Sequence, residues 1–272
     1  MRLPVSEAAT TENTNGRRRG RNVSEIILQA RGLTKDFLGF TAVRDVSLNV
    51  SRNTIHALIG PNGAGKTTVF NLLTKFMEPT SGSIVFKGQD ITRAKAAQVA
   101  RLGMVRSFQI SAVFPHLTVR QNLRVALQRS LGTSFRFWRS IDSIGHLDAQ
   151  ADAILASVGL GEFAGLIAAE LPYGRKRALE IATTLALDPE LMLLDEPMAG
   201  LGQDDIRRIS MLIRAVAKTR TVLMVEHNLS VVADLSDVIT VLTRGQILAE
   251  GPYREIAENV EVREAYLGTG HA

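Results

Sequence analysis

The chain of 272 residues contains no cysteine, which excludes disulfide bonds and thiolate metal sites. It also lacks any run of about 18 apolar residues, so no segment is expected to span a membrane by itself. A signal peptide is not expected either, because the N-terminal stretch is polar and arginine-rich and has no apolar central region. These absences agree with a cytosolic protein, and the 45% hydrophobic content is enough for a well-packed core.

The charge of the chain is only mildly positive. The formal net charge of +5 is a weak sign of nucleic-acid binding, so no nucleic-acid partner is expected. Residues 1–25 hold five arginines and three glutamates, and we predict that this segment and residues 269–272 are disordered, solvated tails. The basic cluster Arg17–Arg21 leaves one alternative open, which is contact with anionic lipid or RNA.

A glycine-rich stretch fits the pattern G-x-x-x-x-G-K-[ST] of a phosphate-binding loop. It consists of Gly60, Pro61, Asn62, Gly63, Ala64, Gly65, Lys66, Thr67 and Thr68. The apolar run Ile55–Ile59 before it predicts a buried strand, and residues 66–76 after it predict a helix. Glycines let backbone N–H groups surround a phosphate, and the start of the helix adds the positive end of a dipole. Lys66 can reach the terminal phosphates, and the hydroxyl of Thr67 can bind Mg²⁺.

The rest of the chain alternates between apolar strands and helical patterns. Strands are predicted at residues 26–37, 42–50, 83–87, 103–108, 191–194, 221–225, 238–242 and 246–249. Helices are predicted at residues 96–102, 174–187 and 204–217, and the region from about 110 to 171 is mostly helical in pattern. Strands that alternate with helices favour a mostly parallel sheet covered on both faces. The sequence therefore predicts an α/β fold, with an antiparallel β subdomain ahead of a P-loop NTPase core and a helical subdomain inserted into that core.

Two carboxylates follow one of the predicted core strands. Asp195 comes directly after the apolar residues 191–194 and can hold Mg²⁺ through its water shell. Glu196 is next in sequence and can polarise the water that attacks a γ-phosphate. An acidic turn at the end of a strand is common, so the prediction depends on the phosphate loop upstream.

Two further polar residues follow core strands. His227 comes after the strand 221–225 and can sense the γ-phosphate and orient the nucleophile. Gln109 comes after the strand 103–108 and can supply an oxygen to Mg²⁺ or water. Each of these two has an equally simple structural explanation when it is taken alone. The candidate catalytic residues are thus Lys66, Glu196 and His227, and the candidate metal ligands are Thr67, Gln109 and Asp195.

Residues 171–182 read Leu-Pro-Tyr-Gly-Arg-Lys-Arg-Ala-Leu-Glu-Ile-Ala and resemble the L-S-G-G-Q signature of ABC-type ATPases. The resemblance runs from about Ile26 to Gly268 and implies a single ABC cassette, whose helical subdomain covers about residues 110–172. In that family the signature opens a helix whose N-terminus faces the ATP held by the other subunit. The resemblance implies this role for Tyr173 and Gly174.

The same resemblance implies roles for three other residues and names the cofactors. Gln109 looks like the glutamine of the family's Q-loop, and His227 looks like the histidine of its H-loop. Phe37 falls where the family stacks an aromatic ring on adenine, although its residue type alone fits a core position equally well. The implied cofactors are ATP and Mg²⁺.

Two residues depart from the family's pattern. Pro172 stands at the signature serine and has neither a hydroxyl nor an N–H group. Gly202 stands where the loop after the acidic strand end usually has an aspartate. Both positions normally act across a dimer interface, so the Gly174 amide and the helix dipole are expected to hold the γ-phosphate alone. ATPase activity is still expected, because the candidate catalytic residues are all present.

Softer signals are similar to those of the ATP-binding subunits of branched-chain amino-acid importers. They are the segments Arg106–Gln109, Phe114–Val119, Tyr173–Gly174, Val225–Asn228 and Glu264–Gly268. Neighbouring branches that import amides or urea, or that export lipopolysaccharide, share several of these segments and remain alternatives. A soluble ABC ATPase acting on nucleic acid or ribosomes is a further alternative, but such proteins usually carry two cassettes or large insertions.

The resemblance also implies partners and a location. The expected partners are membrane permease subunits, a second ATPase subunit that is either identical or a paralogue, and, indirectly, a solute-binding protein. The expected location is the cytoplasmic face of the inner (plasma) membrane, as a peripheral subunit. Phe114 and Leu117, close after Gln109, are predicted to dock on the permease, and the alternative is that they pack inside the helical subdomain.

Overall fold

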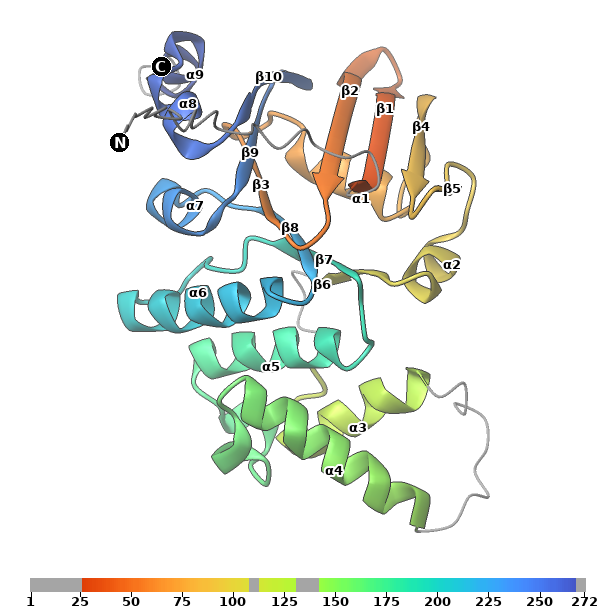
Figure 1. Ribbon diagram of the computed structural model, residues 1–272, viewed down its shortest axis with the longest axis vertical. Coiled ribbons are helices and arrows are strands. Elements are labelled where there is room, and N and C mark those ends of the chain that lie inside the picture. The colour runs from red at the N-terminus through yellow and green to blue at the C-terminus, as the bar shows by residue number, and fades with distance from the viewer. Residues whose placement is uncertain (1–25, 108–112, 131–141, 268–272) are drawn as a thin grey trace, which may run out of the picture.

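The computed structural model describes residues 26–107, 113–130 and 142–267 (Figure 1). The tails predicted at residues 1–25 and 269–272 lie outside these ranges, and so does Gln109. Within the described ranges, no helix has the length and apolar character needed to cross a bilayer.

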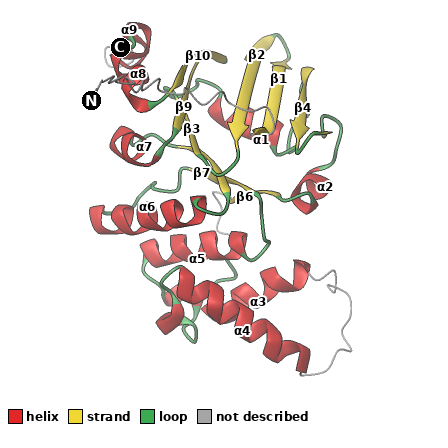
Figure 2. Ribbon diagram, in the orientation of Figure 1, coloured by secondary structure: helices red, strands yellow, loops and turns green. Residues whose placement is uncertain are grey.

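An antiparallel sheet of four strands forms one end of the molecule (Figure 2). In spatial order its strands are β2 (Phe40–Ser51), β1 (Ile26–Phe37), β4 (Ser81–Phe86) and β5 (Gln89–Asp90). Ala30 of β1 pairs with Leu48 on one side and with Ile84 on the other, and all three are buried. This sheet therefore presents an apolar face to the rest of the molecule, as antiparallel sheets with one solvated face do.

The second sheet has six strands and lies at the centre of the molecule. In spatial order its strands are β10 (Gln246–Gly251), β9 (Val238–Thr243), β3 (Ile55–Ile59), β8 (Thr221–Val225), β7 (Leu191–Asp195) and β6 (Met104–Ser107). Neighbouring strands are parallel except for the antiparallel pair of β9 and β10. Ala57 and Ile59 face one hydrophobic core and Leu58 faces another, which explains why β3 reads as an unbroken apolar run.

Helices cover both faces of the central sheet. On one face, α1 (Lys66–Leu73) lies between the two sheets, and its Phe70 is fully buried in the core that they share. The opposite face carries α5 (Tyr173–Leu185), α6 (Gln203–Ala217) and α7 (Leu229–Leu235) (Figure 1). The remaining helices are α2 (Ala96–Arg101), α3 (Val119–Ser130), α4 (Asp142–Ser157), α8 (Tyr253–Glu258), α9 (Val260–Leu267) and the short 3-10 turns Gly161–Phe163 and Ala168–Glu170.

Helices α3 and α4 pack below α5, at the end of the molecule away from the antiparallel sheet (Figure 1). Leu123 of α3 and Leu155 of α4 are fully buried in their common core. Arg120 pairs with Asp152 at 2.7 Å, and these side chains are 39% and 46% exposed. An exposed ion pair contributes only about 0–1 kcal/mol, so the apolar seam is what holds this helical layer together.

The predicted fold class is confirmed, and the predicted element bounds agree within two residues except at the end of α1. The helix predicted at residues 66–76 ends at Leu73. Lys75 has a φ of 61°, and this left-handed conformation stops a helix. The Thr74 hydroxyl also donates to the Phe70 carbonyl at 2.6 Å, which satisfies one of the last acceptors. Because β3, β6, β7 and β8 are parallel, their carboxyl ends meet along one edge of the sheet, where the candidate residues are gathered.

Candidate functional site

The phosphate loop lies between the end of β9 and the start of β2. Gly60 has a φ of 151°, and a Cβ there would lie 2.1 Å from the Leu242 carbonyl oxygen. Gly65 has a φ of 98°, and a Cβ there would lie 2.7 Å from the Ala42 carbonyl oxygen. Backbone packing therefore requires glycine at both positions, independently of any phosphate.

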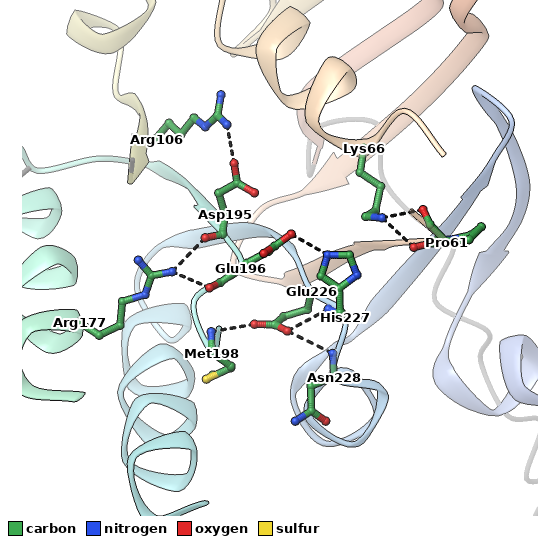
Figure 3. A network of polar contacts seen from close by, with 11 residues as sticks. Pro61, Lys66, Arg106, Arg177, Asp195, Glu196, Met198, Glu226, His227 and Asn228 are labelled. Atoms are coloured by element: carbon green, nitrogen blue, oxygen red, sulfur yellow. Dashed lines mark hydrogen bonds and ion pairs between the residues drawn. The ribbon is translucent and has the colours of Figure 1, made fainter. Parts of the chain in front are cut away.

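The ammonium group of Lys66 lies inside the phosphate loop. Its Nζ donates to the carbonyl oxygens of Gly60 at 2.7 Å and of Pro61 at 2.9 Å (Figure 3). Burial lowers the pKa of Lys66, and the nearby carboxylates of Glu196 and Asp195 oppose that shift. A phosphate would give this partly desolvated cation a full negative charge in place of two neutral carbonyl oxygens. The Thr67 side chain, on the first turn of α1, is exposed and free to bind a ligand.

Asp195, at the end of β7, is almost completely buried and forms an ion pair with Arg106. The Arg106 Nη2 lies 2.5 Å from the Asp195 Oδ2, and the two side chains are 10% and 1% exposed. Arg106 also donates to the Asn71 Oδ1 of α1 at 2.6 Å. The second carboxylate oxygen, Oδ1, has no hydrogen-bond partner among the described residues. An unsatisfied buried oxygen of this kind can bind a hard cation or one of its hydration waters. The Thr67 hydroxyl is also an oxygen ligand that such a cation accepts.

Glu196 and His227 meet directly at the edge of the sheet. The His227 Nε2 lies 2.6 Å from the Glu196 Oε1, and the side chains are 43% and 30% exposed (Figure 3). Glu196 has a φ of 46°, a left-handed conformation that glutamate rarely adopts. This bend makes Glu196 leave the strand in a different direction from Asp195. The structure thus separates a buried carboxylate from an accessible one.

Arg177 of α5 stabilises the backbone bend at Glu196 through hydrogen bonds. The guanidinium group donates to the carbonyl oxygens of Asp195 at 3.0 Å, Glu196 at 2.5 Å and Pro197 at 3.0 Å. Arg177 is itself fixed by Glu180 at 2.6 Å. A non-glycine residue with a positive φ persists only where its surroundings determine it, and these three bonds are part of those surroundings.

Tyr173 and Gly174 lie at the start of α5, where Tyr173 contacts the loop that follows Glu196. The Tyr173 hydroxyl donates to the Ala199 carbonyl oxygen at 3.3 Å, and a Cβ on Gly174 would lie 2.1 Å from the carboxyl carbon of Asp205. Pro172 is the N-cap of α5 and makes no side-chain cap bond. Gly202 is the N-cap of α6 with an extended backbone. Both family departures therefore stand at helix starts.

The other predicted residues have these places. Phe37 is 41% exposed at the end of β1, which excludes a core position, and the Lys35 Nζ lies 5.3 Å from its ring centre. Pro61, Asn62, Gly63, Ala64 and Thr68 belong to the phosphate loop and the first turn of α1. Gln109 lies outside the described residues, so its role stays a prediction.

Four residues of the site had no role in the sequence interpretation. They are Arg106, Arg177, Glu226 and Tyr266, all within segments that the sequence marked only by family resemblance. Tyr266 of α9 makes a hydrogen bond with the backbone of Gly60, the first residue of the phosphate loop. Burial raises the pKa of Tyr266 to about 12, and the backbone contact opposes this shift. The C-terminal helix therefore touches the loop that was predicted to bind phosphate.

Comparison with known proteins agrees with this geometry. Residues 43–199 match the ABC transporter family, and residues 246–272 match a family described as "Branched-chain amino acid ATP-binding cassette transporter". The chain is 39% identical over 254 residues to LivG of Salmonella typhimurium, a "High-affinity branched-chain amino acid transport ATP-binding protein". It is 40% identical over 257 residues to BraF of Pseudomonas aeruginosa, which has the same description. Each alignment covers 90% of this chain and 99% of the relative.

A solved structure shows the same fold. The ADP conformation of MJ1267, "an ATP-binding cassette of an ABC transporter", superposes with a TM-score of 0.79 at 29% identity. The superposition covers 89% of this chain and 99% of that one. The family match covers more than half of the chain, and the two relatives are 39% and 40% identical to it. The chain therefore belongs to the ABC transporter family as an ATP-binding cassette.

Proposed function

We propose that this chain is the ATP-hydrolysing subunit of a membrane importer for branched-chain amino acids or related small solutes. The observation that carries the proposal is the contact of Glu196 with His227 at 2.6 Å, on the same sheet edge as the phosphate loop. This contact supports the roles of general base for Glu196 and orienting partner for His227, beside the position where a γ-phosphate would be bound. The solute class is taken from the descriptions of LivG and BraF and from the C-terminal match.

Nucleotide binding is assigned to the phosphate loop and α1. Backbone N–H groups of the loop and the positive end of the α1 dipole would surround the phosphates, with Lys66 as the countercharge. Thr67, Asp195 and Gln109 would hold Mg²⁺, which supplies charge neutralisation at the phosphate oxygens when it is bound. Phe37 would stack on the adenine, a role that its exposed ring allows.

Hydrolysis is assigned to Glu196 and His227. The Glu196 carboxylate would accept a proton from the attacking water, and the His227 imidazole would hold that carboxylate in place through its Nε2 contact. Asp195 cannot serve as this base, because it is 1% exposed and paired with Arg106. Burial and pairing thus support a division of roles, with metal binding assigned to Asp195 and proton transfer to Glu196.

Transport can be tested by gene replacement. A strain that lacks this chain should lose uptake of radiolabelled leucine, and the wild-type chain should restore it. The Glu196→Gln chain should not restore it, which ties uptake to hydrolysis. Normal leucine uptake in the deletion strain, together with lost uptake of urea or an amide, would assign the subunit to a neighbouring branch instead.

The start of α5 is assigned to a second ATPase subunit, because residues 171–182 resemble the ABC signature, which opens a helix whose N-terminus faces the ATP of the other subunit. Pro172→Ser should tighten ATP-driven dimerisation or speed hydrolysis. The new hydroxyl can donate to the γ-phosphate across the dimer, and a hydrogen bond to a charged group contributes about 1.5–3 kcal/mol. Dimerisation would be followed by gel filtration with ATP, and hydrolysis by phosphate release.

The matched control is Pro172→Ala, which removes the proline ring without adding a hydroxyl. Equal gains in both variants would mean that removing the ring matters and the hydroxyl does not. A serine variant slower than the parent would show that the proline is required at the N-cap of α5.

A permease is expected to dock beside Phe114. This side chain is 51% exposed and lines a cavity of about 210 Å³ with Val125 of α3 and Thr183 of α5. Its backbone is fixed, because Asn122 accepts from the Phe114 N–H at 2.7 Å and donates to its carbonyl oxygen at 3.1 Å. The ring thus stands on a fixed backbone as an apolar anchor at the edge of a mostly apolar hollow.

Phe114→Asp should leave the ATPase activity of the isolated subunit within about twofold, since surface substitutions away from a site cost little. It should abolish uptake and membrane association, which fractionation of cells would show. Met211→Asp, at another exposed apolar side chain on α6, is the control and should transport normally. Unfolding of the Phe114→Asp variant would show that this side chain packs inside the helical subdomain. Normal transport would show that the docking surface lies elsewhere.

A further inference from the structure

Glu226 lies between two loops of the site and binds backbone groups of both (Figure 3). It follows β8, and its side chain is buried, with 3% of the residue exposed. One carboxylate oxygen accepts from the Met198 N–H at 2.8 Å. The other accepts from the N–H of His227 at 3.0 Å and of Asn228 at 3.3 Å. A single carboxylate therefore ties the loop after β7 to the loop after β8.

These two loops carry the pair that meets at the sheet edge. Met198 lies two residues after Glu196, and His227 is the residue that contacts Glu196 through its side chain. The carbonyl oxygens of the first loop are held by Arg177, and its next amide is held by Glu226. The segment from Asp195 to Met198 is thus held by a cation at its carbonyl oxygens and by an anion at the Met198 amide.

A buried carboxylate is costly to desolvate, and hydrogen bonds to its charged form offset that cost. A neutral residue could end β8 without this cost, so the charge needs another explanation. We propose that Glu226 is a positioning residue that sets the spacing between the Glu196 loop and the His227 loop, and so keeps His227 in hydrogen-bond reach of Glu196. The inference rests on the proposed function, because it acts through the hydrolytic pair.

The side-chain chemistry explains why a carboxylate is required. Both oxygens of Glu226 accept, and all three neighbouring groups are backbone donors. Glutamine has one accepting oxygen and one NH₂ group. The NH₂ group would therefore point at a backbone N–H of one loop, and two donors cannot form a hydrogen bond. Aspartate keeps both acceptors but is shorter by one methylene group, so it cannot span the same gap.

The first test is kinetic and uses the full-length subunit. Glu226→Gln should lower kcat about 100-fold, the loss that a misplacement of roughly 1 Å produces. The KM for ATP should stay within about threefold, because the phosphate loop is untouched. Glu250→Gln is the matched control, since Glu250 accepts from Thr240 on β9 and should leave both constants unchanged. An unchanged kcat in Glu226→Gln would overturn the proposal.

The second test asks whether Glu226 acts through His227. Single-turnover rates with enzyme in excess would be measured for Glu226→Gln, His227→Ala and the double variant. We expect the double variant to be no slower than His227→Ala alone, because the positioned group is already gone. If the rate of the double variant falls by the product of the two single losses, Glu226 acts independently of His227, and the proposal is overturned. If Glu226→Gln does not fold, Glu226→Asp takes its place in the same cycle with the same expected outcomes.

The proposed function and the role of Glu226 can fail separately. A wild-type chain without ATP hydrolysis would remove the proposed function. A wild-type chain that hydrolyses ATP, with a Glu226→Gln variant that does so equally well, would leave the function standing and remove only this role of Glu226.

Discussion

Lys66→Ala is expected to raise the Kd for ATP by about 100-fold or more and to abolish turnover. Two charge-assisted hydrogen bonds to phosphate oxygens, at about 1.5 kcal/mol each, account for a change of this size. The buried position of the ammonium group strengthens the effect, since its charge is poorly screened by water. Titration with a fluorescent nucleotide and a phosphate-release assay would measure both quantities.

The control for Lys66 is Lys87→Ala, which removes a cation that pairs with Glu190 at the surface. It should bind ATP normally. The Lys66 variant should also lower the thermal stability of the protein without nucleotide, because the carbonyl oxygens of Gly60 and Pro61 lose their donor. Unchanged ATP affinity in Lys66→Ala would refute the assignment of the loop.

Glu196→Gln is expected to bind ATP with unchanged affinity and to hydrolyse it about 1000-fold more slowly, within the usual range for loss of a general base. Glutamine keeps the shape of the side chain and still reaches His227, but it cannot take a proton from water. The proposed function implies a closed dimer that forms before hydrolysis, so the variant should accumulate as an ATP-bound dimer. Gel filtration with ATP would show the dimer, and gel filtration with ADP would show the monomer.

Glu190→Gln, at an exposed carboxylate paired with Arg52 and Lys87, is the control for the loss of one negative charge. It should hydrolyse ATP at the parental rate. Undiminished hydrolysis in Glu196→Gln, with only monomer in the presence of ATP, would show that another group is the base.

The parts of the fold that local pattern determines were predictable from the sequence. Strand β3 was placed at its observed bounds, because a strand covered on both faces must be apolar throughout. The phosphate loop was predictable because its glycines and Lys66 follow a motif of fixed local spacing. The contacts that require glycine at positions 60 and 65 come from Leu242 and Ala42, and the spacing alone does not reveal them. The predicted end of α1 was wrong, because nothing in the sequence around Lys75 distinguishes a residue with left-handed backbone from a helical one.

The contacts that arrange the site were not predictable. Arg106 and Asp195 are 89 positions apart, and Met198 and Glu226 are 28 apart. In a sequence, a buried arginine or glutamate is indistinguishable from a solvated one, because its partners come from other strands. Motif spacing predicts the groups that are proposed to meet a ligand, whereas the groups that hold them in place required the assembled sheet.

The close approach of Gly174 and Asp205 has a consequence for genetics. A side chain at position 174 would push the Asp205 carboxylate away from the start of α5 and disturb its 2.6 Å bond from Arg208. In a saturation-mutagenesis screen, cells carrying variants at Gly174 would therefore be depleted through this steric conflict, in addition to any lost contact with a second subunit. Repeating the screen in an Asp205→Gly background would relieve the crowding, and the fitness loss that persists there would measure the contact alone.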